Sequence, residues 1–524
     1  MIFRSLHHRL FLISIISFIL ISACSQEKDR PLENSREDVK QTASLLAITR
    51  TVQTAALVAE SATTTPIINP TASEASPAYT PVPTTHKNTR YELAAELDYD
   101  NHKLSAVEQI HFVNNTLEPI PDLLLMVEPD YFPNVFKLNS IAWGNGEPIQ
   151  GYILEKAQLK IPLSEPIKPG EEISLSLTYE LNIPSPEISP NIRPIPFGYT
   201  ERQTNLVDWY PFIPPYITGQ GWLAHEAGYY GEHLAYEISD FQVELKLAGG
   251  RDDLVIAASA ADEGDGEIHR YYHENGRGFA FSVSHMYSVF TQNLGEITIY
   301  SYAFPHHAAA GQSVLKTTAE AVDLYSKIYG PYPRKILSAV EADFLDGMEY
   351  DGLYFLSNAF YNLSKNIPGE YLTAIAAHET AHQWFYAMVG NDQALEPWLD
   401  EALCTYSERL YYENYYPGAL EWWWNYRIYF YQPGGWVNDS IYNPHGVPNA
   451  YRAYRDAVYL NGAIFLEDLR TLIGDESFFA FMADYVTKFT QKIATGDGFF
   501  KLLAVHTDAD IQELINKYFL LEGG

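Results

Sequence analysis

The sequence predicts a multidomain α+β protein, in which an N-terminal antiparallel β-sandwich-like domain precedes a domain with long helices. Short segments that alternate apolar and polar residues recur between about residues 89 and 299. Turn signals such as Asn-Gly at 145–146 and Pro-Gly at 169–170 separate them. Helical periodicity takes over near residue 311, where the amphipathic segment 311–330 ends in Gly-Pro. A chain of 524 residues is long enough for two or three domains with full cores.

The composition is that of a globular protein, with 47% hydrophobic and 19% charged residues. The formal net charge is −32. Because phosphate binding requires basic patches, this charge argues against nucleic acid as a partner.

The first residues resemble a bacterial lipoprotein signal. Arg4 and Arg9 precede an apolar run of about 14 residues, too short for a comfortable membrane span, that ends before Cys24. The four residues that end in Cys24 resemble a lipobox, in which the cysteine becomes lipid-modified. The alternative is an uncleaved anchor helix with an incidental cysteine. We expect a chain anchored in the bacterial cell envelope by lipid on Cys24, with its folded part extracytoplasmic.

A zinc-binding pattern occupies residues 378–382, which read H-E-x-x-H, and Glu401 follows nineteen positions later. Four residues apart on a helix, His378 and His382 lie on one face and can hold one Zn²⁺ at about 2.0–2.1 Å each. Glu401 is the expected third ligand. Three protein ligands leave a fourth position for water, from which Glu379 could take a proton. The competing interpretation is a chance match on an exposed helix.

The surrounding sequence favours the zinc interpretation. Residues 371–389 are apolar almost all round, which predicts a buried helix over that whole range. Burying two histidines and a glutamate there is costly unless they are paired or bind a metal. Glu401 begins another helical stretch, in which Glu408 lies two turns further on the same face. Glu408 could accept the free ring N–H of a zinc-binding histidine, or it could be a solvated glutamate. Cys404, in the same stretch, is expected to be a buried apolar residue.

Several motifs together resemble the gluzincin aminopeptidases, the family that includes aminopeptidase N and leukotriene hydrolase. They occur in the family's order with family-like separations, and the resemblance covers residues 89–524. It implies that a thermolysin-like mixed α/β zinc-peptidase domain follows the sheet domain. The matching parts are the sheet domain, Gly347-Met348-Glu349-Tyr350, the H-E-x-x-H motif, Trp398-Leu399-Asp400-Glu401-Ala402 and Tyr459-Leu460-Asn461-Gly462-Ala463.

The resemblance implies roles for the matched residues. Glu349 corresponds to the glutamate that binds the free α-amine of a peptide, within a substrate-binding segment that includes Gly347 and Met348. A carboxylate near zinc can form a charge-assisted bond with an ammonium group. Tyr459 corresponds to the tyrosine that donates to the oxyanion of the tetrahedral intermediate. Tyr350 stands where the family pattern has Asn, which could reshape the first substrate pocket.

The sequence also departs from the family. Asp400 replaces the usual Asn before the third ligand. About 120 residues follow Glu401, so we expect the large helical C-terminal domain of many relatives to be absent. Glu201 and Gln203 are both candidates for a second amine-binding residue, and the sequence does not decide between them.

The predicted organisation has four parts. They are a lipoprotein signal peptide (1–24), a flexible Thr/Ser/Pro-rich tether (25–88), an N-terminal β-sheet domain (89–200, or to about 300), and a thermolysin-like catalytic domain with a short helical C-terminus (201–524).

The expected function is a zinc-dependent aminopeptidase that uses metal-activated water to remove the N-terminal residue from peptides with a free N-terminus. One alternative is a zinc hydrolase of small non-peptide esters, epoxides or amides. Another is a non-catalytic, surface-anchored binding protein on the same scaffold.

Overall fold

The protein is represented by a computed structural model, which describes residues 87–185, 195–442 and 451–521. These residues belong to one compact unit that begins at Pro83. The predicted signal peptide, Cys24 and nearly all of the predicted tether lie outside the described residues. Among the helices of the described part, none is long and apolar enough to cross a membrane.

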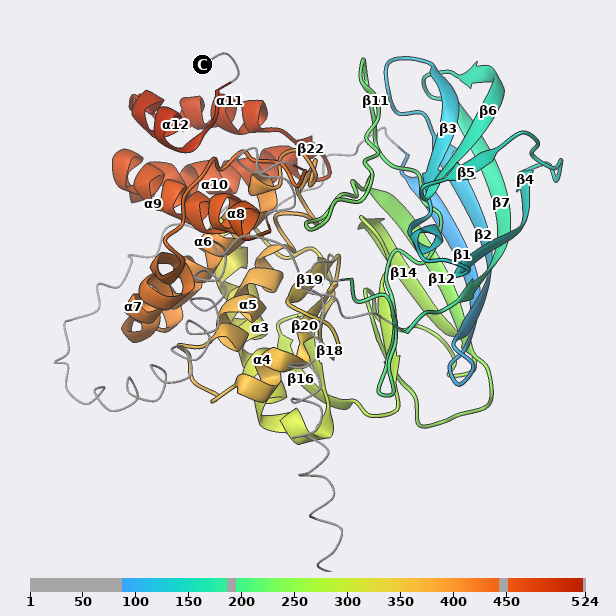
Figure 1. Ribbon diagram of the computed structural model, residues 1–524, viewed down its shortest axis with the longest axis horizontal. Helices are drawn as coiled ribbons and strands as arrows, with labels where there is room; N and C mark the ends of the chain where they lie inside the picture. The colour runs from blue at the N-terminus through green and yellow to red at the C-terminus, as the bar shows by residue number, and fades with distance from the viewer. Residues whose placement is uncertain (1–86, 186–194, 443–450, 522–524) are drawn as a thin grey trace, which may run out of the picture. The chain divides into compact units, whose positions relative to one another are not determined.

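The first part of the described chain is a sandwich of β-sheets (Figure 1). Its six-stranded sheet has the order β14-β12-β1-β2-β7-β4, and it is antiparallel except where β1 pairs with β12. Alternation along β1 buries Tyr91, Leu93, Ala95 and Leu97 on one face, as a half-buried strand requires. The strands are β1 (Thr89–Asp98), β2 (Lys103–Val113), β4 (Phe136–Trp143), β7 (Glu172–Asn182), β12 (Ser239–Leu247) and β14 (His269–Gly276).

Two smaller sheets share a core with this one. Leu125 and Ile161 of the three-stranded sheet, and Phe281 of the four-stranded sheet, belong to the same buried cluster as Leu93. The sandwich predicted for this region is therefore confirmed. The three-stranded sheet contains β3 (Ile120–Met126), β5 (Ile153–Glu155) and β6 (Gln158–Ile167), and the four-stranded sheet β8 (Gly198–Tyr199), β9 (Thr204–Leu206), β13 (Val255–Ala258) and β15 (Phe281–Ser284). A separate hairpin joins β10 (Tyr216–Ile217) and β11 (Gly221–Trp222).

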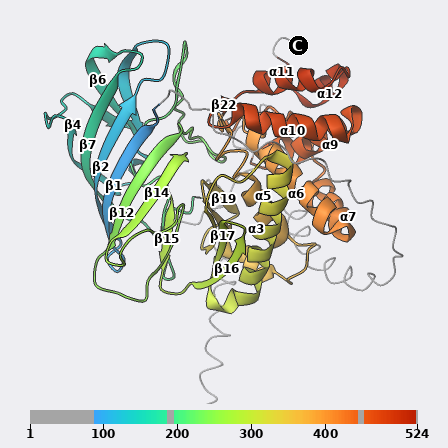
Figure 2. The same ribbon diagram turned by 180° about the vertical axis from the view of Figure 1, so that it is seen from behind.

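The next part is a mixed five-stranded sheet covered by helices (Figure 2). Helix α3 (Ala308–Tyr329) packs on β16, β17 and β18, and α5 (Tyr371–Ala381) packs on β19 and β20. Helix α3 ends at Tyr329, directly before Gly330, which confirms the amphipathic helix predicted there. The strands are β16 (Ser288–Leu294), β17 (Ile297–Ala303), β18 (Ile336–Ala342), β20 (Leu353–Ser357) and the edge strand β19 (Gly347–Tyr350); α4 (Asn358–Leu363) follows β20.

The helix predicted over residues 371–389 is too long. Helix α5 ends at Ala381, and the chain then turns, so that Phe385 and Val389 form an isolated β-bridge. Tyr386 has φ of 132°, which no α-helix can accommodate. Arg277 stabilises the turn by donating to the carbonyl groups of Ala387 and Met388. The apolar run does not end where the helix ends because the turn is also buried.

Helix α6 (Trp398–Tyr415) packs against α5 and confirms the helix predicted around Glu401. A π-helical turn, Asp456–Asn461, contacts α6. The other elements are α7 (Leu420–Trp422), a second π-helical turn (Trp423–Ile428), α8 (Tyr451–Arg455), α9 (Gly462–Ile473), α10 (Asp475–Phe489), α11 (Gly496–His506), α12 (Gln512–Tyr518), and the short paired strands β21 (Gly390–Asn391) and β22 (Ile493–Ala494).

Candidate metal centre

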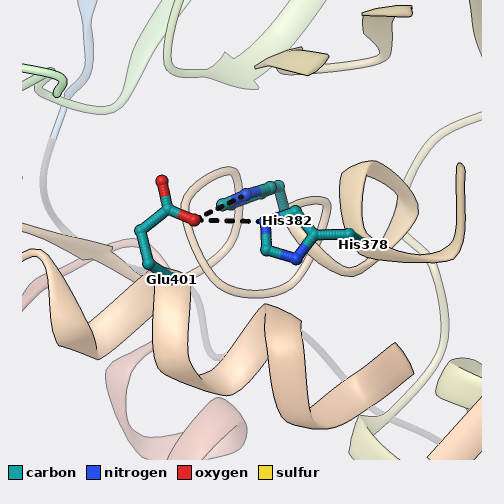
Figure 3. A group of neighbouring side chains, drawn as sticks. All are labelled: His378, His382 and Glu401. Atoms are coloured by element: carbon teal, nitrogen blue, oxygen red, sulfur yellow. Dashed lines mark hydrogen bonds and ion pairs between the residues drawn. The ribbon is translucent and has the colours of Figure 1, made fainter. Parts of the chain in front are cut away.

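The last turn of α5, the residue that follows it and the first turn of α6 bring three side chains together (Figure 3). One carboxylate oxygen of Glu401, Oε2, lies 3.1 Å from His378 Nε2 and 3.6 Å from His382 Nε2. The three residues are buried, and their ligand atoms lie within 4.8 Å of one another. Two imidazole nitrogens and a carboxylate are the donor set of a catalytic zinc site, so these residues fit a single zinc ion.

Hydrogen bonds on the far side of each ring orient the histidines. His382 Nδ1 donates to the carbonyl oxygen of Phe385 at 3.1 Å, and His378 Nδ1 lies 3.0 Å from Glu408 Oε1. Both contacts place the ring proton on Nδ1, since a carbonyl or a carboxylate accepts. Each Nε2 therefore faces the centre, and it is the nitrogen that would bind a metal when the ring is neutral.

Glu408 is held by two residues that the sequence did not single out. Its Oε2 accepts from Trp423 Nε1 at 2.8 Å and from Arg427 Nε at 2.9 Å, and Arg427 also donates to Oε1 at 2.8 Å. Although burial raises the pKa of Glu408, Arg427 and His378 bring it below its usual value. Glu408 is thus a buried carboxylate with a fixed orientation. Only the composition of the π-helical turn, which contains two Trp and one Arg, could have hinted at these partners.

Burial and neighbouring charges shift the pKa values of the site residues in opposite directions. Burial lowers the pKa of His378, but Glu401 and Glu408 outweigh that effect and raise it to about 9. Burial raises the pKa of Glu401, but the two histidines hold it well below its usual range. Glu401 is therefore a carboxylate in the folded protein, the form in which it can bind a metal.

Glu379, the predicted base, is buried beside the metal ligands. In the described part of the chain its Oε2 has no hydrogen-bond partner. Burial raises its pKa well above the usual value. Its Oε1 lies against Gly347, where an added Cβ would come within 2.0 Å of that oxygen. Glycine at position 347 therefore leaves the space that the Glu379 carboxylate occupies.

Tyr459 reaches the same centre from the π-helical turn. Its hydroxyl donates to Glu401 Oε1 at 2.5 Å, and its ring stacks on that of His378 with centroids 6.0 Å apart. Short π-helical turns are frequent at functional sites. The structure brings Tyr459 together with the metal ligands, while its role as an oxyanion donor stays a prediction.

Glu349 points from the edge strand β19 toward the centre. Its Oε2 lies 4.0 Å from His382 Nε2, and it is buried. Two acidic residues that are close to Glu349 in the sequence form other ion pairs: Asp343 pairs with Arg202, and Asp351 pairs with Arg334. Of these three acids, Glu349 is the one positioned beside the metal ligands.

A pocket adjoins Glu349. Among the described residues that line it are Met348, Tyr350, Tyr386, Gln393 and Glu232. Neither candidate for a second amine-binding residue is among them. Gln203 is fully buried, with its Nε2 donating to Tyr287 at 2.6 Å, and Glu201 is exposed.

Gln393 was not identified from the sequence. It donates to Glu349 and to Asp400, which is buried next to Glu401. Cys404 is fully buried on α6, as expected, with Sγ 3.9 Å from the carbonyl oxygen of Phe385.

Comparison with known proteins agrees with this arrangement. Residues 314–518 match the model of the peptidase family M1 domain. A probable aminopeptidase 2 from Sulfurisphaera tokodaii is 23% identical over 44% of this chain and 31% of its own length. Aminopeptidase N from Lactobacillus delbrueckii subsp. lactis is 25% identical over 53% of this chain and 35% of its own length. The chain thus spans about a third of the length of these curated relatives.

Solved structures show the same fold. The M1 zinc metallopeptidase from Deinococcus radiodurans aligns over 82% of this chain and 92% of its own, with a TM-score of 0.57 and 18% identity. A mutant of that enzyme bound to a Tyr-Ser-Ala substrate aligns over 82% of this chain and 94% of its own, with a TM-score of 0.56 and 17% identity. The chain therefore carries a peptidase family M1 domain of the gluzincin type over residues 314–518, with a metal centre that fits a single zinc ion.

Proposed function

We propose that the protein is a zinc-dependent aminopeptidase that hydrolyses the N-terminal residue from peptides. The observation that carries this proposal is the position of Glu349, a buried carboxylate 4.0 Å from His382. A carboxylate beside the metal pairs with the α-ammonium of a substrate and places the first peptide bond at the reacting centre. The curated relatives named as aminopeptidases support the same activity.

Each side chain of the site has a defined task in this proposal. A zinc ion bound by His378, His382 and Glu401 would polarise the scissile carbonyl and activate a water molecule. Glu379 takes the proton of the attacking water and passes it to the leaving amine. Tyr459 turns its hydroxyl from Glu401 to the oxyanion of the tetrahedral intermediate.

A panel of amino-acid anilides, free and N-acetylated, tests this function with and without a chelator. We expect cleavage of free-amine substrates only, and loss of cleavage after chelation. Equal cleavage of blocked substrates would favour the small-molecule hydrolase instead. Stoichiometric zinc without turnover of any substrate would favour the binding protein.

We further propose that the protein is a lipid-anchored component of the bacterial cell envelope, with its catalytic part outside the cytoplasm. The sequence pattern of Arg4, Arg9, the apolar run and Cys24 supports this. Replacing Cys24 with Ala should abolish lipid labelling and release the chain from the membrane fraction. Membrane attachment that persists in the Cys24→Ala variant would contradict lipid anchoring.

A further inference from the structure

Gln393 joins two carboxylates at the metal centre. Its Nε2 donates to Glu349 Oε1 at 3.2 Å and to Asp400 Oδ2 at 3.1 Å. The three side chains are buried, with 4%, 4% and 1% of Gln393, Glu349 and Asp400 exposed. A carboxamide nitrogen carries two hydrogens, so these two bonds use its full donor capacity.

The far end of this bridge is fixed to the metal-binding helix. Asp400 Oδ1 accepts from the backbone N–H of Glu401 at 2.7 Å, in the first turn of α6. Gln393 thus connects the helix that carries a metal ligand to the edge strand that carries Glu349. No other hydrogen bond from a side chain to the Glu349 carboxylate is found among the described residues.

The loop that carries Gln393 is itself well held. Asp392 Oδ1 accepts from the backbone N–H groups of Ala394 and Leu395 at 3.1 and 3.0 Å, forming an Asx turn. The other oxygen of Asp392 lies 3.0 Å from His225 Nε2, in the segment before β12. A side chain on a loop anchored in this way can set the position of its partners.

Electrostatics explain why a donor is needed at this point. Glu349, Asp400 and His382 have ligand atoms within 4.8 Å of one another. Two carboxylates this close in a buried site repel each other, and the repulsion costs more than it would in water. A shared donor offsets the repulsion and fixes the distance between the carboxylates. Without Gln393, we expect Glu349 to move away from Asp400 and lose its alignment with the substrate.

We propose that Gln393 is a positioning residue that holds the Glu349 carboxylate in the orientation that binds a substrate's α-ammonium. This inference rests on the proposed aminopeptidase function. Because Gln393 acts through Glu349, its loss should weaken binding of the free amine more than it slows the chemical step.

Binding is measured on the full chain, loaded with zinc, in a Glu379→Gln background that does not turn over. Calorimetry compares L-leucinamide with N-acetyl-L-leucinamide. Replacing Gln393 with Met preserves side-chain length and removes the donor. We expect the dissociation constant for L-leucinamide to rise about tenfold or more, as for a lost bond to a charged group. Affinity for the acetylated amide should not change.

Steady-state kinetics with leucine anilide use Gln393→Met without the background substitution. KM should rise about tenfold, while kcat changes by less than about threefold. Gln242→Met, an exposed glutamine on β12, is the matched control and should leave both constants unchanged. Zinc content and thermal unfolding are measured for every variant. Should Gln393→Met fail to fold, Gln393→Asn keeps the donor on a shorter arm and should show a smaller rise in KM.

The outcomes distinguish failure of the positioning role from failure of the proposed function. Folded, zinc-loaded Gln393 variants that bind L-leucinamide as tightly as the parent overturn the positioning role, and so does a fall in kcat with KM unchanged. If the parent neither binds L-leucinamide nor cleaves any free-amine substrate, the proposed function fails, and this inference fails with it.

Discussion

At the residue scale, the orientation of each histidine at the metal centre depends on the hydrogen bond that its Nδ1 makes. His378 and His382 present Nε2 to Glu401 because Nδ1 of each ring is already bonded, to Glu408 and to the Phe385 carbonyl. Glu408 is in turn held by Arg427 and needs no rearrangement to fill this position. The orientation of the two histidine rings is therefore set by contacts on the side away from the candidate metal position.

Replacing Glu379 with Gln tests the base. The substitution keeps the shape of the side chain and removes its ability to accept a proton. We expect activity to fall by about 10²–10⁴-fold, the usual contribution of general acid–base catalysis, with zinc content unchanged. A fully active, zinc-loaded Glu379→Gln protein would exclude Glu379 as the base.

Replacing Glu408 with Gln tests the support of His378. The variant loses the charge that makes the imidazole a stronger ligand and pairs with Arg427. Zinc affinity, measured by competition with a chelator, should fall about 10–100-fold. An exposed carboxylate such as Glu180, replaced in the same way, serves as the control and should have no effect. Unchanged affinity in Glu408→Gln would mean that His378 is oriented by other contacts.

At the element scale, the site lies where helix ends meet a sheet edge. Helix α5 ends immediately before His382, α6 begins just before Glu401, and β19 is the edge strand of its sheet. At its edge, β19 comes so close to α5 that Gly347 contacts the Glu379 carboxylate. This close approach requires a residue without a side chain.

Gly347→Ala should therefore impair catalysis more than folding. The new methyl group would displace the Glu379 carboxylate, and misplacement by about 1 Å can cost about 10²-fold in rate. Kinetics and thermal unfolding measured together will show whether activity falls while the melting temperature changes little. Gly418→Ala, at a glycine with no atom within 4 Å of an added Cβ, is the control. Normal activity in Gly347→Ala would show that the carboxylate has room to move.

The candidate metal ligands and one of their supports, Glu408, could be predicted from the sequence, whereas the other supports could not. His378, His382 and Glu401 follow a spacing that helix geometry makes readable, and so does Glu408, two turns beyond Glu401. Gln393, Trp423 and Arg427 carry no such signal, since each contacts the site through a turn or loop with no fixed register to it. The predicted end of α5 is wrong because the chain remains buried and apolar after the helix ends.

At the scale of the whole molecule, a buried ion pair beside the mixed sheet contacts the β-sheets that precede residue 285. Asp351, in the turn between β19 and β20, binds Arg334 through both oxygens at 2.9 and 2.6 Å. It also accepts from the backbone N–H of Arg277 and lies 3.4 Å from His273 on β14. Asp351 follows Glu349 by two residues, so this contact also anchors the strand that carries the amine-binding candidate.

The ion pair between Asp351 and Arg334 predicts that the folded protein loses stability at acidic pH. Burial raises the pKa of Asp351, but Arg334 and His273 hold it well below its usual value. A depressed pKa contributes stability above the unfolded value of about 4, and that contribution is lost as the pH falls further. Asp351→Asn should cost about 3 kcal/mol at pH 7, since it leaves Arg334 buried and unpaired.

Denaturant unfolding of wild type and Asp351→Asn between pH 7 and pH 3 checks this prediction. The difference in unfolding free energy should be largest above about pH 5 and should shrink toward pH 3. Asp100→Asn, at an exposed acid paired with Arg251, is the control and should change little. A difference that stays constant across the range would contradict the ionic role of Asp351.

The most direct measurement is a crystal structure of the zinc-loaded protein, with data collected on both sides of the zinc absorption edge. The account predicts one anomalous peak per chain, bound by Nε2 of His378 and His382 at about 2.0–2.1 Å and by the carboxylate of Glu401. A peak at any other position, or a Glu401 carboxylate turned away from both imidazoles, would contradict it.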